Sequence, residues 1–268
     1  MHGIGYLMES DEEIFRLEIK TDPEIVKREA LWAGLKPGMK IADIGCGSGK
    51  TTAILYDLVQ PGGKATGVDV SKERIAHAVA QYGHDGLDFT CQDMLRPLDG
   101  LVNFDFVWVR FLLEYYRKES FDIVRNIDRI LKPGGTLCLI DLDYNSLSHY
   151  GLSPKLESTI NDAMKALEEK ANFDPYVGRK LYSFLFDLGY QDIDVKIGAH
   201  HLIFGELKET DAFNWMKKIE LVSPKICNQF RGTDWEYDEF IRDFQDFFYN
   251  PRRFTYSPLI CCRGRKPQ

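Results

Sequence analysis

Glycines and acids end two apolar segments early in the chain, in an order that suits binding of a nucleoside. The first segment, IADI at 41–44, runs into GCGSG at 45–49. The second, GVDV at 67–70, places Asp69 twenty residues after Gly49. Glycines let a backbone turn tightly and approach a ligand closely. An acid that ends the second strand can accept hydrogen bonds from ribose hydroxyls. These residues therefore predict recognition of a ribose-bearing ligand.

The glycine spacing distinguishes between classes of nucleotide. A dinucleotide-binding turn has the pattern G-x-G-x-x-G and directs the next helix at a pyrophosphate. Here the pattern is G-x-G-x-G, and Asp43 precedes it. An acid beside the turn repels a pyrophosphate but can accept hydrogen bonds from an ammonium group. S-adenosylmethionine, with a ribose and an ammonium but no phosphate, fits better. The segment Gly49-Lys50-Thr51 resembles a P-loop, but that motif needs a glycine at position 44, where the chain has Ile.

Length and charge narrow the class of protein. The 268 residues suit one α/β domain with insertions, or one domain with a cap. The formal net charge is −7 and the sequence pI about 5.5. This balance argues against a nucleic-acid partner, because binding a phosphate backbone needs a basic face. We expect a small-molecule partner and a monomer or homodimer.

Cysteine usage and hydropathy indicate the compartment. The six cysteines show no metal-ligand spacing such as C-x-x-C, and several lie in apolar strands, where a free thiol behaves as a small hydrophobe. We therefore expect no bound metal and a reducing, cytoplasmic location. No signal sequence and no apolar run of membrane-spanning length is present, so no membrane partner is expected.

The elements that must position these residues alternate between strand and helix, which is typical of a parallel sheet with crossover helices. The predicted class is α/β, with a Rossmann-like doubly wound sheet. The predicted strands cover Lys40–Ile44, Lys64–Asp69, Leu87–Cys91, Phe104–Arg110, Gly135–Asp141, Asp192–Gly198 and Phe254–Cys262.

Four segments are predicted along the chain. Residues 1–36 form an N-terminal helical cap, 37–203 the ligand-binding core, 204–250 a helical insert and 251–268 the closing strand of the core. Eleven of the 47 residues of the insert are aromatic, against 13% of the whole chain. Helical spacing of the phenylalanines from 240 to 248 favours packing of the insert onto the domain over a direct role in substrate binding. Its length makes the insert the candidate lid.

With the glycines and the acid placed, the chain resembles the class I S-adenosylmethionine-dependent methyltransferases, in the subgroup of ubiquinone and menaquinone biosynthesis. Four segments carry the resemblance, in the family's order: IADIGCGSG (41–49), GVDVS (67–71), CQDM (91–94) and LKPGG (131–135). The resemblance is strong over about 36–143. It implies a seven-stranded sheet whose last strand is antiparallel beside the sixth. Pro258 interrupts that strand, so we expect a bulge or an unpaired position there.

The resemblance also implies the cofactor contacts. Asp43 would lie near the methionine amino group, Asp69 would accept the ribose hydroxyls, Asp93 would accept the adenine amine, and Arg110 would face the methionine. The N-terminal segment would fold over the cofactor. The full implied set is Asp43, Gly45, Cys46, Gly47, Asp69, Val70, Gln92, Asp93, Met94 and Arg110, with Tyr6 and Arg16 from the N-terminal segment.

Methyl transfer from a sulfonium is an in-line displacement, so the protein mainly positions and desolvates the reactants. A base is needed only where the nucleophile must lose a proton, and no convincing catalytic signature is visible. Topology places Tyr115, Asp141 and His149 near the carboxyl ends of strands four and five, and these are weak catalytic candidates. His200 and His201 lie near the end of strand six and are weaker ones.

The leading function is an enzyme that methylates an oxygen, nitrogen or carbon of a small molecule. A protein or tRNA methyltransferase is the alternative within the same chemistry, and a basic groove around strands four and five would favour tRNA. A non-catalytic protein that binds S-adenosylmethionine is a further alternative. The glycine spacing and the LKPGG segment oppose a nicotinamide-dependent dehydrogenase.

Overall fold

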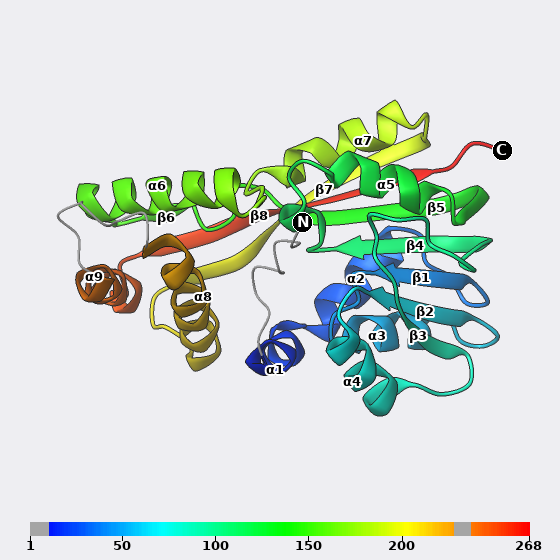
Figure 1. Cartoon of the computed structure of the whole chain (residues 1–268), viewed down its shortest axis with the longest axis horizontal. Coiled ribbons are helices and arrows are strands. Elements are labelled where there is room, and N and C mark those ends of the chain that lie inside the picture. Colours follow the sequence, from blue (N-terminus) through cyan, green and yellow to red (C-terminus); the bar gives the residue numbers. More distant parts are fainter. Residues whose placement is uncertain (1–10, 228–236) are drawn as a thin grey trace.

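The computed structural model describes residues 11–227 and 237–268. Five parallel strands make up the first part of the sheet, in the order β3-β2-β1-β4-β5 (Figure 1). The strand order reverses between β1 and β4, and in such sheets ligands bind at the carboxyl ends of the strands at this switch point. The strands are β1 (Lys40–Ile44), β2 (Lys64–Asp69), β3 (Leu87–Cys91), β4 (Phe104–Arg110) and β5 (Leu131–Leu142).

An antiparallel part completes the sheet. Strand β8 (Phe254–Arg265) lies between β5 and β7 (Gln191–Phe204) and is antiparallel to both. The prediction of an antiparallel last strand beside the sixth is confirmed. All seven predicted strands are present, and β6 (His149–Tyr150), which pairs with β8, was not predicted.

The structure refines the prediction for Pro258 and corrects the one for the LKPGG segment. Pro258 marks no bulge, because it pairs in register with Ala199 of β7 and the register shift falls between His200 and Ile203, but it is the expected unpaired position on the β5 side. The pairing of β8 with β5 ends at Leu259, so Pro258 has no ladder partner in β5. The missing N–H of proline is therefore harmless there. The LKPGG segment lies inside β5 rather than before it.

Helices cover both faces of the sheet (Figure 1). Alternate side chains of β4 pack into two separate cores, with Phe106 and Trp108 in one and Val107 and Val109 in the other. A strand buried on both faces reads as a continuous apolar run, as this one does. One face carries α2 (Pro23–Trp32), α3 (Lys50–Leu58) and α4 (Lys72–Tyr82), and the other carries α5 (Ser120–Asp128) and α7 (Leu181–Asp187).

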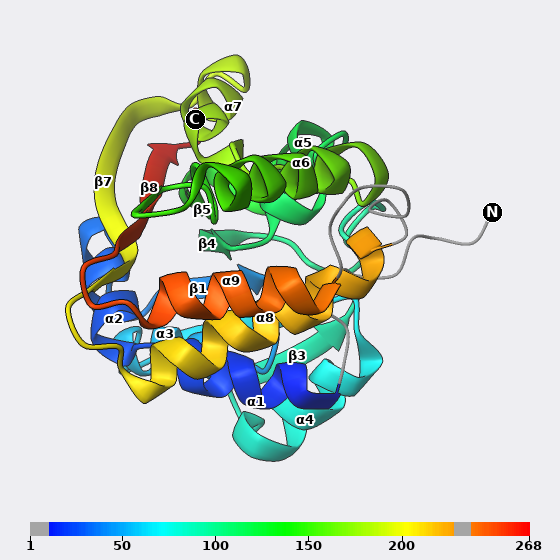
Figure 2. The ribbon, with the colours of Figure 1, turned by 90° about the vertical axis from the view of Figure 1, so that its left-hand side faces the viewer.

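Further helices gather beyond the carboxyl ends of the parallel strands (Figure 2). They are α1 (Asp11–Lys20), α6 (Pro154–Lys170), α8 (Glu209–Cys227) and α9 (Tyr237–Tyr249). Leu156 of α6, Trp215 of α8 and Phe244 and Phe248 of α9 share one buried cluster. These aromatic residues of the insert pack helix on helix, which agrees with the structural interpretation, whereas Phe204 and Tyr249 are exposed and Phe230 and Trp235 lie outside the described residues. The division of the chain into four segments stays a prediction.

Short polar residues determine where the helices begin. Asp22 accepts a hydrogen bond from the Glu24 N–H at 2.9 Å, and Ser71 accepts one from the Arg74 N–H at 3.3 Å. Both are N-caps that satisfy otherwise unpaired helix donors. Because Ser71 is the N-cap of α4, Asp69 is left available for another role. No helix within the described residues is long and apolar enough to span a membrane.

Candidate functional site

A pocket lies where β1 and β4 end, at the switch point of the sheet. Its walls come from α1, from the loop after β1, from the first turn of α4 and from the residues that follow β4. The lining residues are Arg16, Leu17, Thr21, Asp43, Gly45, Cys46, Gly47, Ser48, Thr51, Arg74, Arg110, Phe111 and Tyr115. Six of the twelve residues predicted as cofactor contacts are among them.

The glycine loop at 45–49 has a backbone conformation that residues other than glycine rarely adopt. Gly45, Gly47 and Gly49 have φ angles of +79°, +55° and +90°. The turn brings the N–H groups of Gly45 and Cys46 to the Val68 carbonyl, at 2.8 and 3.0 Å. A Cβ on Gly49 would lie 2.7 Å from the Ala78 Cβ. The turn therefore needs glycine both for its conformation and for its contact with α4.

Asp69 anchors this loop from the neighbouring strand. Its Oδ2 accepts the Gly47 N–H at 2.9 Å and its Oδ1 accepts the Ser71 N–H at 3.0 Å. Arg74 Nε lies 3.6 Å from Oδ1, and both side chains are buried. A carboxylate offers about four acceptor positions, so at least one position on Oδ2 is left for a ligand hydroxyl. Gly47 and Arg74, its neighbours, line the pocket, while Asp69 lies just behind them.

Asp43 is a buried carboxylate in the pocket wall. Its Oδ2 accepts a hydrogen bond from Thr52 Oγ1 at 2.7 Å. Burial raises the pKa of Asp43 to about 7, the Thr52 hydroxyl and Arg110 oppose the shift, and Asp69 adds to it. An acid held this way is near its titration point at neutral pH and gains from a cationic ligand.

Arg110 reaches the pocket from the end of β4. Its Nε lies 3.5 Å from Glu29 Oε2, and its guanidinium covers the Phe111 ring at 4.1 Å from the ring centroid. Burial lowers the pKa of Arg110 and raises that of Glu29. Sequence reasoning missed Glu29. It occupies the apolar face of α2 with Val26 and Ala30, and an acid in such a stripe was the available signal.

The residues predicted to contact adenine lie beside the pocket but do not line it. Asp93 Oδ1 accepts the Leu95 N–H at 2.9 Å, and the Gln92 side chain donates to the Asp99 carbonyl. Val70 is 40% exposed and the Met94 side chain is buried in the core. Burial raises the pKa of Tyr116, and Asp93 and Asp69 raise it further. The Tyr116 phenol is therefore within electrostatic reach of both acids.

Helix α1 closes the pocket on one side. Arg16 is buried and lines it, and Leu17 packs 3.0 Å from the position that a Cβ on Gly47 would occupy. Glu18 joins α1 to the core: its carbonyl accepts the Lys50 ammonium and its Oε2 accepts the Tyr82 hydroxyl at 2.8 Å. Arg16 thus lies in the pocket wall, and its contact with a cofactor stays a prediction. Tyr6 lies outside the described residues.

The three catalytic candidates occupy different environments. Tyr115 lines the pocket. Asp141 is buried behind it, where its Oδ2 accepts the N–H groups of Leu113 and Glu114 at 3.0 and 3.3 Å. Burial, with Glu114 next, raises the pKa of Asp141 well above its usual value. Asp141 therefore shapes the turn that carries Tyr115, the short helix η1 (Leu113–Tyr115).

His149 has both ring nitrogens engaged, by Thr255 Oγ1 at 2.9 Å and by the Ser146 carbonyl at 3.1 Å. Burial lowers its pKa to about 4, so the ring is neutral, donates to Ser146 and accepts from Thr255. This environment favours a structural role for His149. His200 and His201 lie at the β7 register shift, and the His200 ring is 5.0 Å from the ring of Phe111 in the pocket wall.

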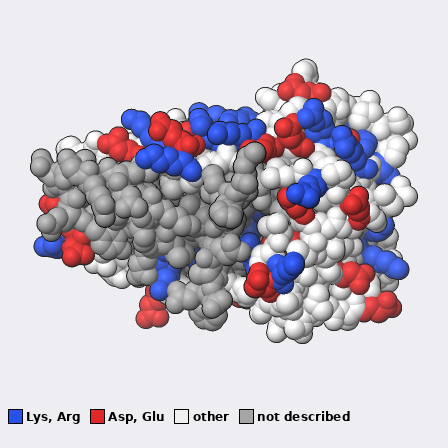
Figure 3. All heavy atoms as spheres, in the orientation of Figure 1, with Lys and Arg blue, Asp and Glu red and all other residues white. Residues whose placement is uncertain are grey.

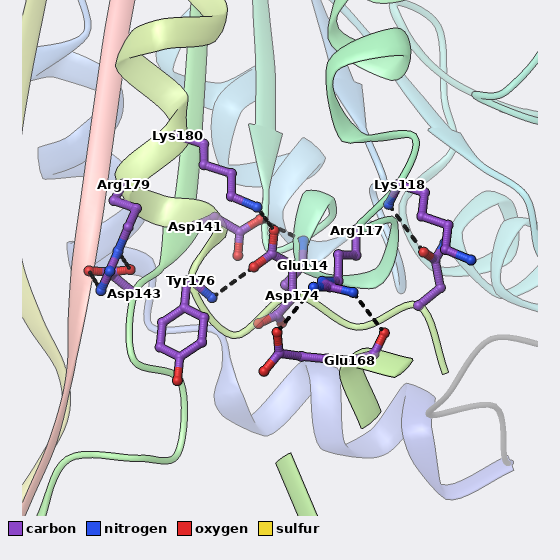
Figure 4. A network of polar contacts seen from close by, with 11 residues as sticks. Glu114, Arg117, Lys118, Asp141, Asp143, Glu168, Asp174, Tyr176, Arg179 and Lys180 are labelled. Atoms are coloured by element: carbon purple, nitrogen blue, oxygen red, sulfur yellow. Dashed lines mark hydrogen bonds and ion pairs between the residues drawn. The ribbon is translucent and has the colours of Figure 1, made fainter. Parts of the chain in front are cut away.

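A buried polar network continues from the pocket behind η1 (Figure 4). The Glu114 carbonyl accepts the Asp174 N–H at 2.7 Å, and Asp174 is paired with Lys180. Glu114 also connects the network to the insert, because its Oε2 accepts from Asn145 Nδ2, and Asn145 Oδ1 accepts from Lys218 Nζ of α8 at 3.1 Å. Sequence reasoning missed Lys218, although it lies among apolar residues of its helix, one turn from Trp215.

Comparisons with known proteins show what part of this chain is similar to. Residues 42–139, less than half of the chain, match the family described as a methyltransferase domain. The match supports a class I S-adenosylmethionine-dependent methyltransferase. An O-methyltransferase, cnsE, of Penicillium expansum is 30% identical over 110 residues, which cover 39% of this chain and 38% of the relative. The demethylmenaquinone methyltransferase of Lactococcus lactis is 28% identical over 42% of this chain and 46% of the relative. The match thus spans less than half the length of these two relatives.

A longer match names the same kind of enzyme, and the solved structures show the same fold. The ubiquinone/menaquinone biosynthesis C-methyltransferase UbiE of Shewanella sediminis is 23% identical over 60% of this chain and 70% of the relative. A structure of a Bacillus halodurans protein described as a putative methyltransferase has a TM-score of 0.58 at 17% identity, and the match covers 91% of this chain and all of that one. The [4+2]-cyclase SpnF has a TM-score of 0.57 at 18% identity, with 91% and 81% covered. Because one neighbour is a cyclase, the fold alone does not determine the reaction.

Proposed function

We propose that this chain binds S-adenosylmethionine in the pocket at the end of β1 and transfers its methyl group to a small molecule. The observation that carries the proposal is the placement of the buried Asp43 carboxylate beside the glycine turn, with Arg16 and Arg110 in the same pocket wall. A methionine group has an ammonium and a carboxylate. An acid and arginines that face one cavity are the matching partners.

The residues present fit this cofactor in its methionine and ribose parts. The free oxygen of Asp43 can accept from the ammonium, since Thr52 occupies the other oxygen. Arg16 and Arg110 line the cavity and can bind the carboxylate. Asp69 retains one acceptor position, beside Gly47, for a ribose hydroxyl. We assign the adenine to the neighbourhood of Tyr116 and Asp93, next to Asp69.

The chain's own residues position the reactants and exclude water. When bound, S-adenosylmethionine supplies an electrophilic methyl group on its sulfonium. Leu17 and the Phe111 ring give the cavity apolar walls, and Tyr115 stands where the acceptor enters over the ends of β4 and β5. Positioning of two reactants in a dry cavity provides much of the rate enhancement in a direct displacement.

A small-molecule acceptor agrees with the relatives. The matched relatives include methyltransferases named for demethylmenaquinone and for ubiquinone/menaquinone, together with an O-methyltransferase. On the face drawn in Figure 3, acidic and basic side chains are mixed over much of the described surface, and several Lys and Arg side chains gather along its upper edge. The acceptor atom, whether oxygen, nitrogen or carbon, is left open between these relatives.

Calorimetric titration of the purified protein with S-adenosylmethionine, with NAD as the control ligand, tests the cofactor assignment. We expect binding of the first ligand alone. Asp69→Ala should weaken it about 100-fold, since the loss removes a charged hydrogen-bond acceptor worth about 2–3 kcal/mol. Asp88→Asn is the matched control, because Asp88 is an exposed acid on the adjacent strand. Binding of NAD, or equal losses in the two variants, would contradict the assignment.

Turnover is tested separately from binding. Incubation with S-adenosylmethionine and a mixture of phenols, enols, amines and quinols should release S-adenosylhomocysteine with one class of acceptor. Tight cofactor binding without release for any class would instead support the alternative of a protein that binds S-adenosylmethionine without methyl transfer.

A further inference from the structure

We propose that this chain forms a homodimer through an apolar face of the sheet segment that carries the insert, with a second copy of the chain as the partner. We call this surface the outer face. It comprises Tyr150 of β6, Phe204 of β7, and Phe254 and Tyr256 of β8. None of these four residues lines the pocket. The proposal therefore goes beyond the proposed function and does not depend on it.

The pairing of three strands places the four side chains on one side of the sheet. Phe254 is directly opposite Tyr150 of β6 and directly opposite Phe204 of β7. Residues that are directly opposite each other in a sheet share a face, and so do alternate residues along a strand, such as Phe254 and Tyr256. The Phe254 ring stacks on the Phe204 ring at 6.3 Å between centroids and lies 5.8 Å from the Tyr256 ring. The four side chains therefore form one continuous aromatic surface.

The two faces of this sheet segment differ in what covers them. Ile203 and Thr255, which alternate with the outer-face residues, are buried, and Ile203 packs in the cluster with Trp215 of the insert. In Figure 2, β7 and β8 lie at the left, and α6, α8 and α9 extend to the right of them. The residues of the outer face are 38% to 75% exposed, Tyr150 the most. The solvent face of an antiparallel sheet normally carries polar side chains, so a row of aromatic residues there indicates a surface that a partner covers.

The area of the outer face corresponds to the apolar part of one side of a stable interface. A buried aromatic residue covers about 200 Å², so the exposed fractions leave about 400 Å² of surface on the four residues. One side of a standard interface buries about 800 Å², of which about 450 Å² is apolar. Aromatic residues are also the ones enriched at the centre of such interfaces. The outer face therefore supplies nearly the whole apolar area that a dimer of this kind needs.

Charged residues beside the outer face make it complementary to a second copy. Glu206 follows Phe204 by two residues, Arg252 precedes Phe254 by two, and both charged residues are exposed. Because β7 and β8 are antiparallel, the two charges lie at the same end of the outer face, next to neighbouring strands. A two-fold axis parallel to the strands, between β7 and β8, places β7 of one copy over β8 of the other in an aligned packing of two sheets. Each Glu206 then lies opposite Arg252 of the other copy.

A second copy on the outer face fits these observations better than a lipid surface or a strand added to the edge of β7. The flanking charges are of both signs and the net charge of the chain is −7, which disfavours attachment to an anionic membrane. Register shifts interrupt β7 between Gln191 and Asp194 and between His200 and Ile203. Irregularities of this kind protect the edge of a sheet from pairing with another strand.

Sedimentation equilibrium of the unmodified chain tests the dimer directly. The proposal expects a monomer–dimer equilibrium with a Kd of about 1–10 µM, at the weak end for an interface of this size. Phe204→Thr and Tyr150→Thr should each raise the Kd at least about 10-fold, because they remove aromatic anchors of the interface. Threonine suits an exposed strand position, and circular dichroism of the monomers checks that the fold is kept. Val79→Gln, which replaces an apolar residue of α4 that is 49% exposed, is the control and should leave the Kd unchanged.

Charge reversal tests the arrangement of the two copies. Glu206→Arg and Arg252→Glu should each weaken the dimer about 10-fold, because each places like charges opposite one another. The double variant should restore most of the affinity, since it exchanges the two charges across the same axis. Additive losses in the double variant, a dimer that Phe204→Thr leaves unchanged, or a chain that stays monomeric at every concentration would overturn the proposal. Flotation with vesicles of neutral and of anionic phospholipid completes the test: a monomer whose binding to vesicles Tyr150→Thr abolishes would assign the outer face to a lipid surface instead.

Discussion

The Thr52 hydroxyl donates a hydrogen bond to Asp43 Oδ2 at 2.7 Å, and both residues are buried. Thr52 belongs to the first turns of α3, and Asp43 to the end of β1. The bond joins the two elements on either side of the glycine turn. It leaves the other carboxylate oxygen of Asp43 for the pocket, where burial keeps the acid near its titration point.

Cofactor binding should therefore depend on pH through Asp43. Its pKa of about 7 in the free protein means that the carboxylate is protonated below neutrality and cannot pair with an ammonium. We expect the Kd for S-adenosylmethionine to rise up to about 10-fold for each pH unit below 7, which corresponds to about 1.4 kcal/mol per unit. Calorimetry between pH 5.5 and 8.5 measures this slope. Asp43→Asn should bind weakly with a nearly flat profile, whereas the Asp88→Asn control should keep the slope. A flat profile in the unmodified sequence would contradict the role of Asp43.

The same acid should lower the stability of the ligand-free protein at high pH. The folded-state pKa of about 7 lies above the ordinary value of 3.8, so the folded state binds the proton more tightly than the unfolded state. Its stabilising contribution is complete below about pH 4 and is lost as pH rises through 7. The side chain in Asp43→Asn stays neutral at every pH. The change that this substitution makes to the free energy of unfolding should therefore be about 2 kcal/mol more stabilising at pH 8 than at pH 5. Urea denaturation at the two pH values, compared with the unmodified sequence, measures the difference. An equal effect of the substitution at both values would argue against a raised pKa.

Glu29 and Arg110 form a buried ion pair, and removal of one partner should destabilise the protein. Glu29→Gln leaves the Arg110 guanidinium without its nearest counter-charge in the pair at 3.5 Å. Loss of one partner of a buried pair typically costs about 3–5 kcal/mol, so the midpoint of thermal unfolding should fall markedly. The double variant Glu29→Gln with Arg110→Met should recover part of this loss. The exposed pair of Lys27 and Glu24 on the same helix is the control, and Glu24→Gln should change the free energy of unfolding by less than about 1 kcal/mol. Additive effects of Glu29→Gln and Arg110→Met would mean that the two residues do not interact.

The parallel part of the fold could be predicted closely from local patterns. Strands β1 to β4 begin and end at the predicted residues, because a polar residue or a glycine lies at or next to each end. The predicted end of the sixth strand fell short. Predicted as Asp192–Gly198, it extends to Phe204, since β7 continues along β8 past His200 and His201, which do not read as a strand. Strand β6 has two residues and depends wholly on its pairing with β8.

Residues of the site could be predicted only where they lie together in one short segment of the sequence. The turn at 45–49, Asp43 and Asp69 were recognisable because chemistry and spacing coincide within one βαβ unit. Glu29 and Lys218 come from helices far away in the sequence, and only the folded chain brings them to Arg110 and Asn145. A charged residue within the apolar stripe of a helix indicates that its side chain is buried. The pattern does not predict which residue it contacts.

Gly49 should tolerate substitution less well than Gly38, a glycine with a similar φ angle but no neighbouring atoms around its Cβ position. Its φ is +90°, and an added Cβ would lie 2.7 Å from the Ala78 Cβ and 3.0 Å from the Phe89 ring. Gly38 has a φ of +82° and no atom within 4 Å of an added Cβ. Gly38→Ala should therefore show the backbone strain alone, about 1 kcal/mol, whereas Gly49→Ala adds the clash with α4 and should lose about 3 kcal/mol. Urea denaturation measures the free energy of unfolding of both variants, and the difference between the two losses gives the cost of the clash with α4. Because the clash would displace the turn that holds Gly47 against Asp69, Gly49→Ala should also weaken S-adenosylmethionine binding at least about 10-fold, and Gly38→Ala should not. Equal losses of stability in the two variants would show that α4 yields to the methyl group and that the close approach at Gly49 does not determine the geometry of the turn.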